Sequence, residues 1–310
     1  DQGRPNLARK LYQQALDITR EVGDKRFEGI WLGYYALLHH EQGQSEQAKK
    51  LFTQALDLVR NVGDKRREGM WLGHLAVVHL DLGYPDQART LLKQAMDLAQ
   101  LVGDQRNQAA WLGYYALLEH ECGHMEQAQQ LFEKALDHNR EVKNRKGEAT
   151  WLTELGTLYL DQGHPDQAKE LYKQALNIAE GLDDLSLKAY GLLYLSILYR
   201  RTEPDYKKAE AIIKQALEMF NGLKKRREAG LCWCELGHYT LDKGQAVQKI
   251  LAQIQELVTQ LTLTPKSKLG QALDRLHRAH QAYEAGALSQ LYRGELMQDI
   301  PVRLRRHLGI

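Results

Sequence analysis

The segment from His120 to His124 reads HECGH and matches the HExxH pattern of zinc proteases. That site needs both histidines one helical turn apart on one face, with the glutamate placed as a general base. Gly123 stands where the sequence predicts a helix end, so His124 is expected outside that helix. The matching segments HHEQGQ and LDQGH each lack one of the two histidines. We therefore interpret HECGH as a helix end and expect no metal site.

The cysteines and the remaining short motifs give no sign of catalysis. Cys232 and Cys234 are two positions apart, which on a helix separates them by about 200° around the axis, so we expect core residues and not a chelating pair. With Cys122 they form no disulfide framework, and so few cysteines suit a reducing cytosol. Because no phosphate loop, nucleophile elbow or catalytic carboxylate pair is recognisable, we expect neither an enzyme nor a cofactor.

Acidic residues recur at intervals of 40 positions, at Glu41, Asp81, Glu121 and Asp161, and again at Asp242. The segments 30–41, 70–81, 110–121 and 150–161 around them contain no Lys, Arg or Asn. A column of carboxylates beside tyrosines favours a bound segment that carries Lys or Arg, through charge-assisted hydrogen bonds and cation–π contacts. The alternative is that the acids are solvated residues at helix ends. His40 and His120 each adjoin an acid and could add pH dependence.

These residues belong to an internal repeat of 40 residues. Nearly identical blocks begin at Trp31, Trp71, Trp111 and Trp151, for example WLGYYALLHHEQG, and each is followed by a second block such as SEQAKKLFTQALDL. Apolar residues in the second blocks are three and four apart, which places them on one face of a helix. We expect the repeated tryptophan to pack between units. Each unit is predicted to be two antiparallel helices that bury their apolar faces on neighbouring units.

Glycine, proline and aspartate mark the predicted helix ends. A glycine separates the two blocks of each unit, at Gly43, Gly83, Gly123 and Gly163. Proline follows two residues later at Pro85 and Pro165, where the first turn of a helix tolerates it. The GDKR and GDQR segments end the second helix at Gly23, Gly63 and Gly103, and cap the next helix with Asp24, Asp64 and Asp104.

The units resemble the tetratricopeptide repeat in their small residues, at Ala36, Ala76, Ala116 and Gly156, and in the downstream sets Ala48/Phe52/Ala55, Ala88/Leu92/Ala95, Ala128/Phe132/Ala135 and Ala168/Tyr172/Ala175. That family usually repeats every ~34 residues, and the longer interval here extends the helix ends around the GDKR turn. HEAT and armadillo repeats have a similar period but lack this alanine and aromatic spacing. The resemblance covers about residues 1–260. It implies an all-α, right-handed superhelical solenoid of antiparallel helix hairpins.

The resemblance also implies that the first helices line a concave face that binds a protein or peptide. The lining positions in the four full units hold Gly33, Leu37, His40 and Glu41; Gly73, Val77, Leu80 and Asp81; Gly113, Leu117, His120 and Glu121; and Thr153, Thr157, Leu160 and Asp161. The groove edge is expected at Tyr34, His74, Tyr114 and Glu154. Family members that hold the carboxyl terminus of chaperones use Lys and Asn in these helices, so that ligand is disfavoured.

We divide the chain into a repeat array over residues 1–264 and C-terminal capping helices over 265–310. The array has about six units, and the first is truncated, because residues 1–18 match the second helix at 161–178. We therefore expect a C-terminal piece of a larger protein. Helices are predicted over 246–261, 267–285 and 302–308, and a basic docking tail is the alternative to a cap for 265–310. The KKRR segment at 224–227 is expected to be a solvated loop.

Charge and hydropathy narrow the class of partner. Lys and Arg number 42 against 40 Asp and Glu, and no run of 18 apolar residues exists, so we expect neither nucleic acid nor a membrane as partner. The favoured function is a cytoplasmic scaffold or sensor that binds a protein or peptide. Similar arrays follow bacterial signalling ATPases, kinases and transcription regulators, which implies a signalling role. The alternative is a self-association module, a homo-oligomer that brings upstream effector domains together.

Overall fold

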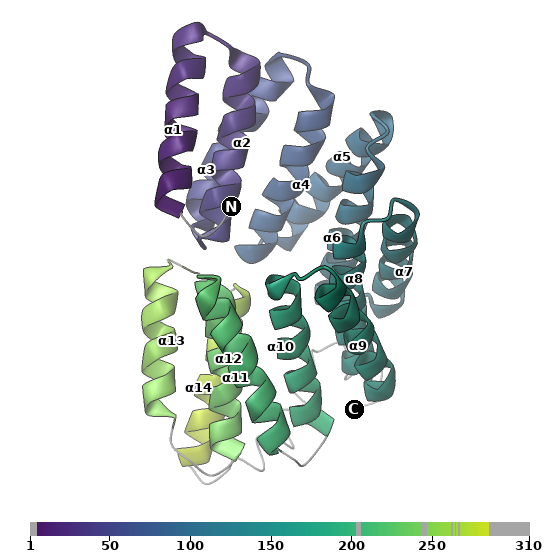
Figure 1. Cartoon of the computed structure of the whole chain (residues 1–310), viewed down its shortest axis with the longest axis vertical. Coiled ribbons are helices and arrows are strands. Elements are labelled where there is room, and N and C mark those ends of the chain that lie inside the picture. Colours follow the sequence, from purple (N-terminus) through teal and green to yellow (C-terminus); the bar gives the residue numbers. More distant parts are fainter. Residues whose placement is uncertain are drawn as a thin grey trace.

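The computed structural model describes residues 5–202, 206–242, 247–261, 263, 265 and 267–284 (Figure 1). Within these residues the chain forms fourteen helices and no strand. The helices are α1 (Pro5–Val22), α2 (Lys25–Glu41), α3 (Ser45–Asn61), α4 (Lys65–Asp81), α5 (Pro85–Leu101), α6 (Gln105–Cys122), α7 (Met125–Glu141), α8 (Arg145–Asp161), α9 (Pro165–Gly181), α10 (Leu185–Thr202), α11 (Tyr206–Gly222), α12 (Arg226–Asp242), α13 (Gln248–Gln260) and α14 (Lys268–Glu284). None of them is both long and apolar enough to cross a bilayer.

From α2 onwards, consecutive helices pair as antiparallel hairpins, α2 with α3 through to α12 with α13. The joints within the first four hairpins turn at Gly43, Gly83, Gly123 and Gly163, whose φ angles lie between 77° and 87°. That left-handed conformation strains any residue with a side chain. Asp24, Asp64 and Asp104 each accept the backbone N–H three residues further on, at 3.1, 3.1 and 3.2 Å. The predicted helix ends and caps are therefore confirmed.

Each buried tryptophan of the repeat lies directly over a glycine of the preceding unit. A Cβ added at Gly73 would stand 2.2 Å from Cε2 of Trp111, far inside van der Waals contact. The same approach joins two further pairs, Gly33 with Trp71 and Gly113 with Trp151. Trp71 and Trp111 are 0% and 1% exposed. The expected packing of the tryptophan column between units is confirmed for these three rings.

The next joint between units lacks the tryptophan. Thr153 occupies the position equivalent to Gly113, and Gly191 occupies the position equivalent to Trp151. Both residues are buried, and a Cβ at Gly191 would come within 2.7 Å of Leu176 of the preceding helix α9. This joint is therefore closely packed without an aromatic ring at the repeat position.

Ion pairs join consecutive units at the turns. Arg60 of α3 donates to Glu68 of α4 at 2.9 Å, and Lys65 donates to the other carboxylate oxygen at 2.8 Å. The arrangement recurs at Arg20/Lys25 with Glu28 and at Arg140/Arg145 with Glu148. Burial alone would raise the pKa of Glu68, but the two cationic donors outweigh it and hold that pKa below its usual value. Ion pairs at these turns therefore add to the apolar contacts that hold consecutive units together.

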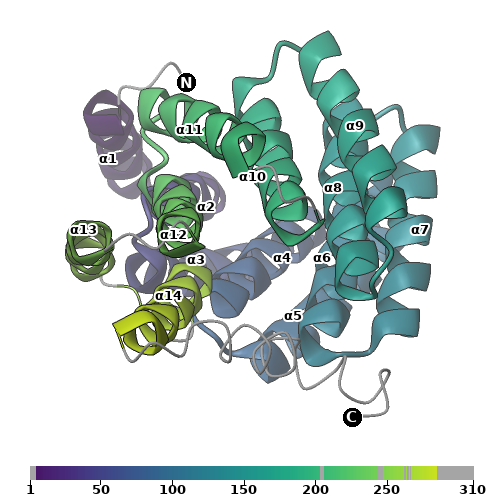
Figure 2. The ribbon, with the colours of Figure 1, turned by 90° about the horizontal axis from the view of Figure 1, so that it is seen from below.

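The first helices face the inside of the superhelix. Figure 2 shows α4, α6 and α8 on the inner side of the curve and α5, α7 and α9 on the outer side. Accordingly α2 packs on α4, α4 on α6, α6 on α8 and α8 on α10, whereas the second helices of neighbouring units make no comparable contact in the described part of the chain. The units therefore lie closer together on the inner side, at the first helices, than on the outer side, and this difference curves the stack. The predicted all-α superhelical solenoid is confirmed.

The last described helix, α14, packs on α12 and α13. Leu269 and Leu276 are fully buried in one cluster with Ile254 of α13. Ser267 precedes the helix and its hydroxyl accepts the N–H of Gly270 at 3.1 Å. The predicted helices over 246–261 and 267–285 are therefore present as α13 and α14, with slightly shorter bounds. The predicted helix over 302–308 lies outside the described residues, and the boundary at 264/265 stays a prediction.

The joint between glycine and tryptophan predicts a large effect of a single methyl group. We expect Gly73→Ala to lower the free energy of unfolding by about 1–3 kcal/mol, because the buried ring of Trp111 has no space to move into. The better helix propensity of alanine opposes this loss by about 1 kcal/mol. Urea denaturation followed by circular dichroism measures the difference.

Gly181→Ala is the matched control, because nothing lies within 4 Å of a Cβ at Gly181. This variant should be neutral or slightly more stable than the parent chain. Wild-type stability of Gly73→Ala, or an equal loss in both variants, would show that the ring does not depend on that glycine.

Candidate partner-binding face

One half-buried residue per unit stands at the middle of each inner helix face: Leu37, Val77, Leu117 and Thr157. These four positions are equivalent in the repeat and lie 40 residues apart. Leu37 and Val77 pack partly on the first core cluster and Leu117 on the next one. The hydroxyl of Thr157 lies 3.2 Å from that of Tyr172 and also donates to its own helix. Together these residues form a mainly apolar, partly accessible strip across four units, which we call the inner strip.

Three predicted groove-edge residues contact the tryptophan column. The rings of Tyr34, His74 and Tyr114 meet Trp71, Trp111 and Trp151 edge to face, with centroids 5.3, 5.2 and 5.2 Å apart. Such aromatic pairs add stability beyond the area they bury. Burial, with the nearby charge of His40, lowers the pKa of His74 to about 4, so this imidazole is neutral at pH 7. These residues bind neighbouring units together and present only part of their rings to a ligand.

Asp81 already has two side-chain partners from the same chain. His40 Nε2 lies 2.6 Å from its carboxylate, and Arg227 of α12 donates to the same oxygen. Burial alone would raise the pKa of Asp81, but Arg227 and His40 outweigh it and hold the pKa well below its usual value. Asp81 is therefore ionised and paired.

Asp161 repeats this arrangement two units later. His120 Nε2 lies 3.2 Å from one oxygen of Asp161, and Arg201 donates to the other at 3.0 Å. Its pKa is likewise lowered, because the hydrogen bond from His120 and the charge of Arg201 outweigh the effect of burial. Each of the two predicted histidines thus pairs with an acid of the following unit.

The other predicted acids differ in exposure. Glu41 is exposed at the end of α2, and Glu121 and Glu154 are half-buried on α6 and α8. The charge of Glu41 adds to the effect of burial in raising the pKa of Tyr12. Glu41 is thus the most exposed of these carboxylates, while Asp81 and Asp161 take part in internal ion pairs.

Six of the expected lining positions are buried, among them His120 and Leu160, which are 8% and 9% exposed. Gly33, Gly73, Gly113 and Thr153 are buried in the joints between units and do not reach the inner surface. A side chain at the glycine positions would collide with the tryptophan of the next unit. The repeat pattern alone does not reveal this, because a glycine that lines a groove and a glycine beneath a ring look alike in sequence.

Sequence reasoning missed the two arginines that pair with the acids. Arg201 follows Asp161 by 40 residues, so its place at the acidic position of the next unit was a usable signal. Arg227 lies 146 residues from Asp81 in the chain, and no local pattern predicts that contact. The expectation of a solvated KKRR segment is wrong for Arg227, whose side chain is 23% exposed.

The HECGH segment and the two cysteines near residue 233, which resemble metal-binding motifs in sequence, have structural roles. Gly123 ends α6 with a φ of 87°, and His124 lies beyond it, where its ring contacts Glu119. His120 instead points to Asp161, so the two histidines of HECGH have different acidic partners. Cys232 and Cys234 are buried, which raises the pKa of both thiols. The expectation that these cysteines belong to the core is confirmed.

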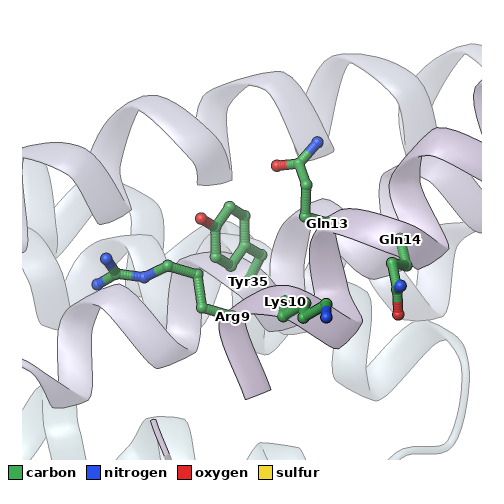
Figure 3. A pocket seen from close by; sticks show the side chains of 5 residues that line it. All are labelled: Arg9, Lys10, Gln13, Gln14 and Tyr35. Atoms are coloured by element: carbon green, nitrogen blue, oxygen red, sulfur yellow. The ribbon is translucent and has the colours of Figure 1, made fainter. Parts of the chain in front are cut away.

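A shallow hollow between α1 and α2 contains none of the predicted residues. Figure 3 shows its lining by Arg9, Lys10, Gln13 and Gln14 of α1 and by Tyr35 of α2. A second hollow between α11, α12 and α13 has Trp233 and Arg226 in its wall. Both are open surface depressions, and neither brings catalytic groups together.

Comparisons with known proteins agree with this architecture. A family model of the tetratricopeptide repeat matches residues 1–61, 66–137 and 107–181. No curated protein matches the sequence. Among solved structures, a Rap protein complexed with competence and sporulation factor is similar, with 16% identity and a TM-score of 0.60, over 91% of this chain and 86% of its own.

Two further structures share the fold. NprR in complex with its cognate peptide NprX is 17% identical, with a TM-score of 0.61, over 80% of this chain and 75% of its own. A signal transduction ATPase with a tetratricopeptide repeat sensor, from Pyrococcus horikoshii, is 17% identical with a TM-score of 0.54. That match covers 96% of this chain and 49% of the ATPase. The family model spans more than half of the residues, and the chain therefore belongs to the tetratricopeptide repeat family.

Proposed function

We propose that this chain is a non-catalytic recognition array that binds a segment of another protein along the inner strip. The observation that carries the proposal is the strip itself, in which Leu37, Val77 and Leu117 stay half-exposed at the same position of three units. Apolar side chains repeated along a concave face suit the alternate anchors of an extended or helical segment. The structures of similar fold that hold a factor or a peptide support a ligand of this kind.

The chemistry of the partner follows from the residues around the strip. Apolar side chains would pack on Leu37, Val77 and Leu117, and Lys or Arg side chains would meet Glu41 and Glu121 at the helix ends. Asp81 and Asp161 are less available, because each already holds a histidine and an arginine. The proposed ligand is therefore an amphipathic segment with a few basic residues, and not a uniformly basic one.

The proposed setting is the sensor or scaffold part of a larger cytoplasmic signalling protein. It is supported by the likeness to an ATPase of which the matched repeat sensor is only one part. Non-catalytic action is supported by two observations. His120 and His124 each contact an acidic residue of the chain, and Cys232 and Cys234 are buried.

Self-association is a second candidate function. Each unit buries its apolar faces on the neighbouring units, and a second copy of the chain could be bound in the same way. Light scattering distinguishes the candidates, because self-association raises the mass with protein concentration and recognition of a foreign segment alone does not.

Replacing apolar residues of the inner strip should weaken binding. A peptide selected from a random display library on the wild-type chain serves as ligand, and fluorescence polarisation measures its Kd. We expect the double change Leu37→Gln and Leu117→Gln to raise Kd by about tenfold or more, because one lost apolar anchor is worth about 1.5–3 kcal/mol.

The control is Leu91→Gln with Leu131→Gln, the same change at two half-buried positions on the outer helices α5 and α7. These substitutions should leave Kd within about twofold. Equal weakening by both pairs, or an unchanged Kd for the inner pair, would move the binding site off the inner strip.

Charge reversal at two acids near the ends of the inner helices should change which ligands bind. We expect Glu41→Lys with Glu121→Lys to weaken peptides that contain Lys or Arg, most clearly at low ionic strength, where exposed charges are least screened. The fold should persist, because these two acids stand at helix ends and not in the joints. Kd at low and high salt, for a basic peptide and for its uncharged counterpart, measures the effect.

Asp57→Lys with Asp97→Lys is the control, since both residues are exposed on the outer helices α3 and α5. The proposed basic preference fails if both pairs shift Kd alike, or if the inner pair has no effect on the basic peptide. In that case the acids of the inner face are only solvated residues at helix ends.

A further inference from the structure

The superhelix closes on itself near its two ends. In Figure 1 the upper ends of α12 and α13 lie below the lower ends of α2, α3 and α4, and in Figure 2, seen from below, α12 lies in front of α2. In a solenoid each unit normally contacts only its neighbours, and an isolated contact between distant units is an addition to that pattern. Here the contact joins the first and last described units.

We propose that the contact between α2–α4 and α12–α13 is a clasp that fastens the superhelix into a closed turn and opens without unfolding any unit. It involves Asp81 and His40 on one side and Arg227 on the other, with Leu261 seated on Gly43. The inference concerns the free protein and does not rest on the proposed function.

The polar half of the clasp is half-buried and shared by four helices. Arg227, in the first turn of α12, pairs with Asp81 at the end of α4, and their side chains are 23% and 18% exposed. His40 of α2 completes the pairing of Asp81. On the other side Arg227 lies 3.5 Å from Glu228, which accepts a hydrogen bond of 2.8 Å from Tyr190 of α10. Each charge of the clasp therefore meets an opposite charge or a hydrogen-bond donor.

The apolar half of the clasp joins two turns. Leu261 follows α13 and is 5% exposed. Its side chain faces Gly43, where an added Cβ would stand 3.2 Å from Cδ2 of Leu261. Gly43 has a φ of +77° and ends the first helix of its unit, so the leucine packs on a turn that has no side chain of its own.

Two comparisons indicate that the clasp can open while the helices and the joints between neighbouring units stay intact. Three of the joints between neighbouring units contain buried tryptophans, whereas among the described residues the clasp shows one ionic cluster and one leucine. Asp161 offers a natural control, because its pairing with His120 and Arg201 has the same chemistry but joins neighbouring helices α8 and α10. Loss of Arg201 should leave the shape unchanged, and loss of Arg227 should release the two ends.

The test measures the distance between the two sides of the clasp. Spin labels are placed on cysteines at the exposed positions Asp57 of α3 and Gln255 of α13, in a Cys122→Ser background. Double electron–electron resonance then reports the distribution of distances. We expect one short distance in the parent chain and a longer, broader distribution in Arg227→Ala, with Arg227→Lys between the two.

Arg201→Ala should retain the parent distribution, and circular dichroism should show equal helix content in all variants. Raising NaCl from about 0.1 to about 1 M, which shortens the screening length from about 10 to about 3 Å, should lengthen the distance in the parent more than in Arg227→Ala. If Arg227→Ala loses helix content, Asp81→Asn tests the same cluster from the other side. A parent-like distribution in a folded Arg227→Ala or Asp81→Asn chain would overturn the clasp.

Discussion

The stack depends on the contact in which a tryptophan ring of one unit occupies the space above a glycine of the unit before it. Neither residue has this role within its own hairpin, so the contact acts only between neighbours and fixes how one unit sits on the next. Because the glycine brings two first helices close together, the inner side of the stack is shortened relative to the outer side. That joint therefore sets the curvature of the stack, the position of its inner face and the spacing of the residues in the inner strip. The joint at Thr153 and Gly191 has no tryptophan, and Leu176 packs on Gly191 instead.

The inner face is made of positions that the joints leave partly uncovered. Aromatic edges at Tyr34, His74 and Tyr114 serve the joints, while Leu37, Val77 and Leu117 remain half-exposed between them. Histidine and arginine neutralise Asp81 and Asp161, because a half-buried carboxylate is costly without a partner. The surface that remains for a partner is consequently more apolar than the acidic column suggests, and its charge is concentrated at a few helix ends.

The fold could be predicted because its signals are local and repeated. Helix ends at Gly43 and Gly123 and the packing role of Trp71 follow from 40-residue periodicity and from turn chemistry. The site could be predicted only in part, since the repeat places Asp81 and Asp161 on the inner side but does not reveal what they contact. Arg227 reaches Asp81 only after the superhelix has completed its turn, and such a contact depends on the accumulated geometry of every joint between them. Periodicity alone does not determine that geometry.

The central claim is that a partner segment lies along the inner side of the first helices. Hydrogen–deuterium exchange of the chain with and without a bound peptide tests this directly, because backbone protection is located by segment. The account predicts added protection in 30–41, 70–81 and 110–121, the inner segments of α2, α4 and α6, and little change in α3, α5 and α7. Protection confined to the outer helices or to the exposed face of α1 would contradict it.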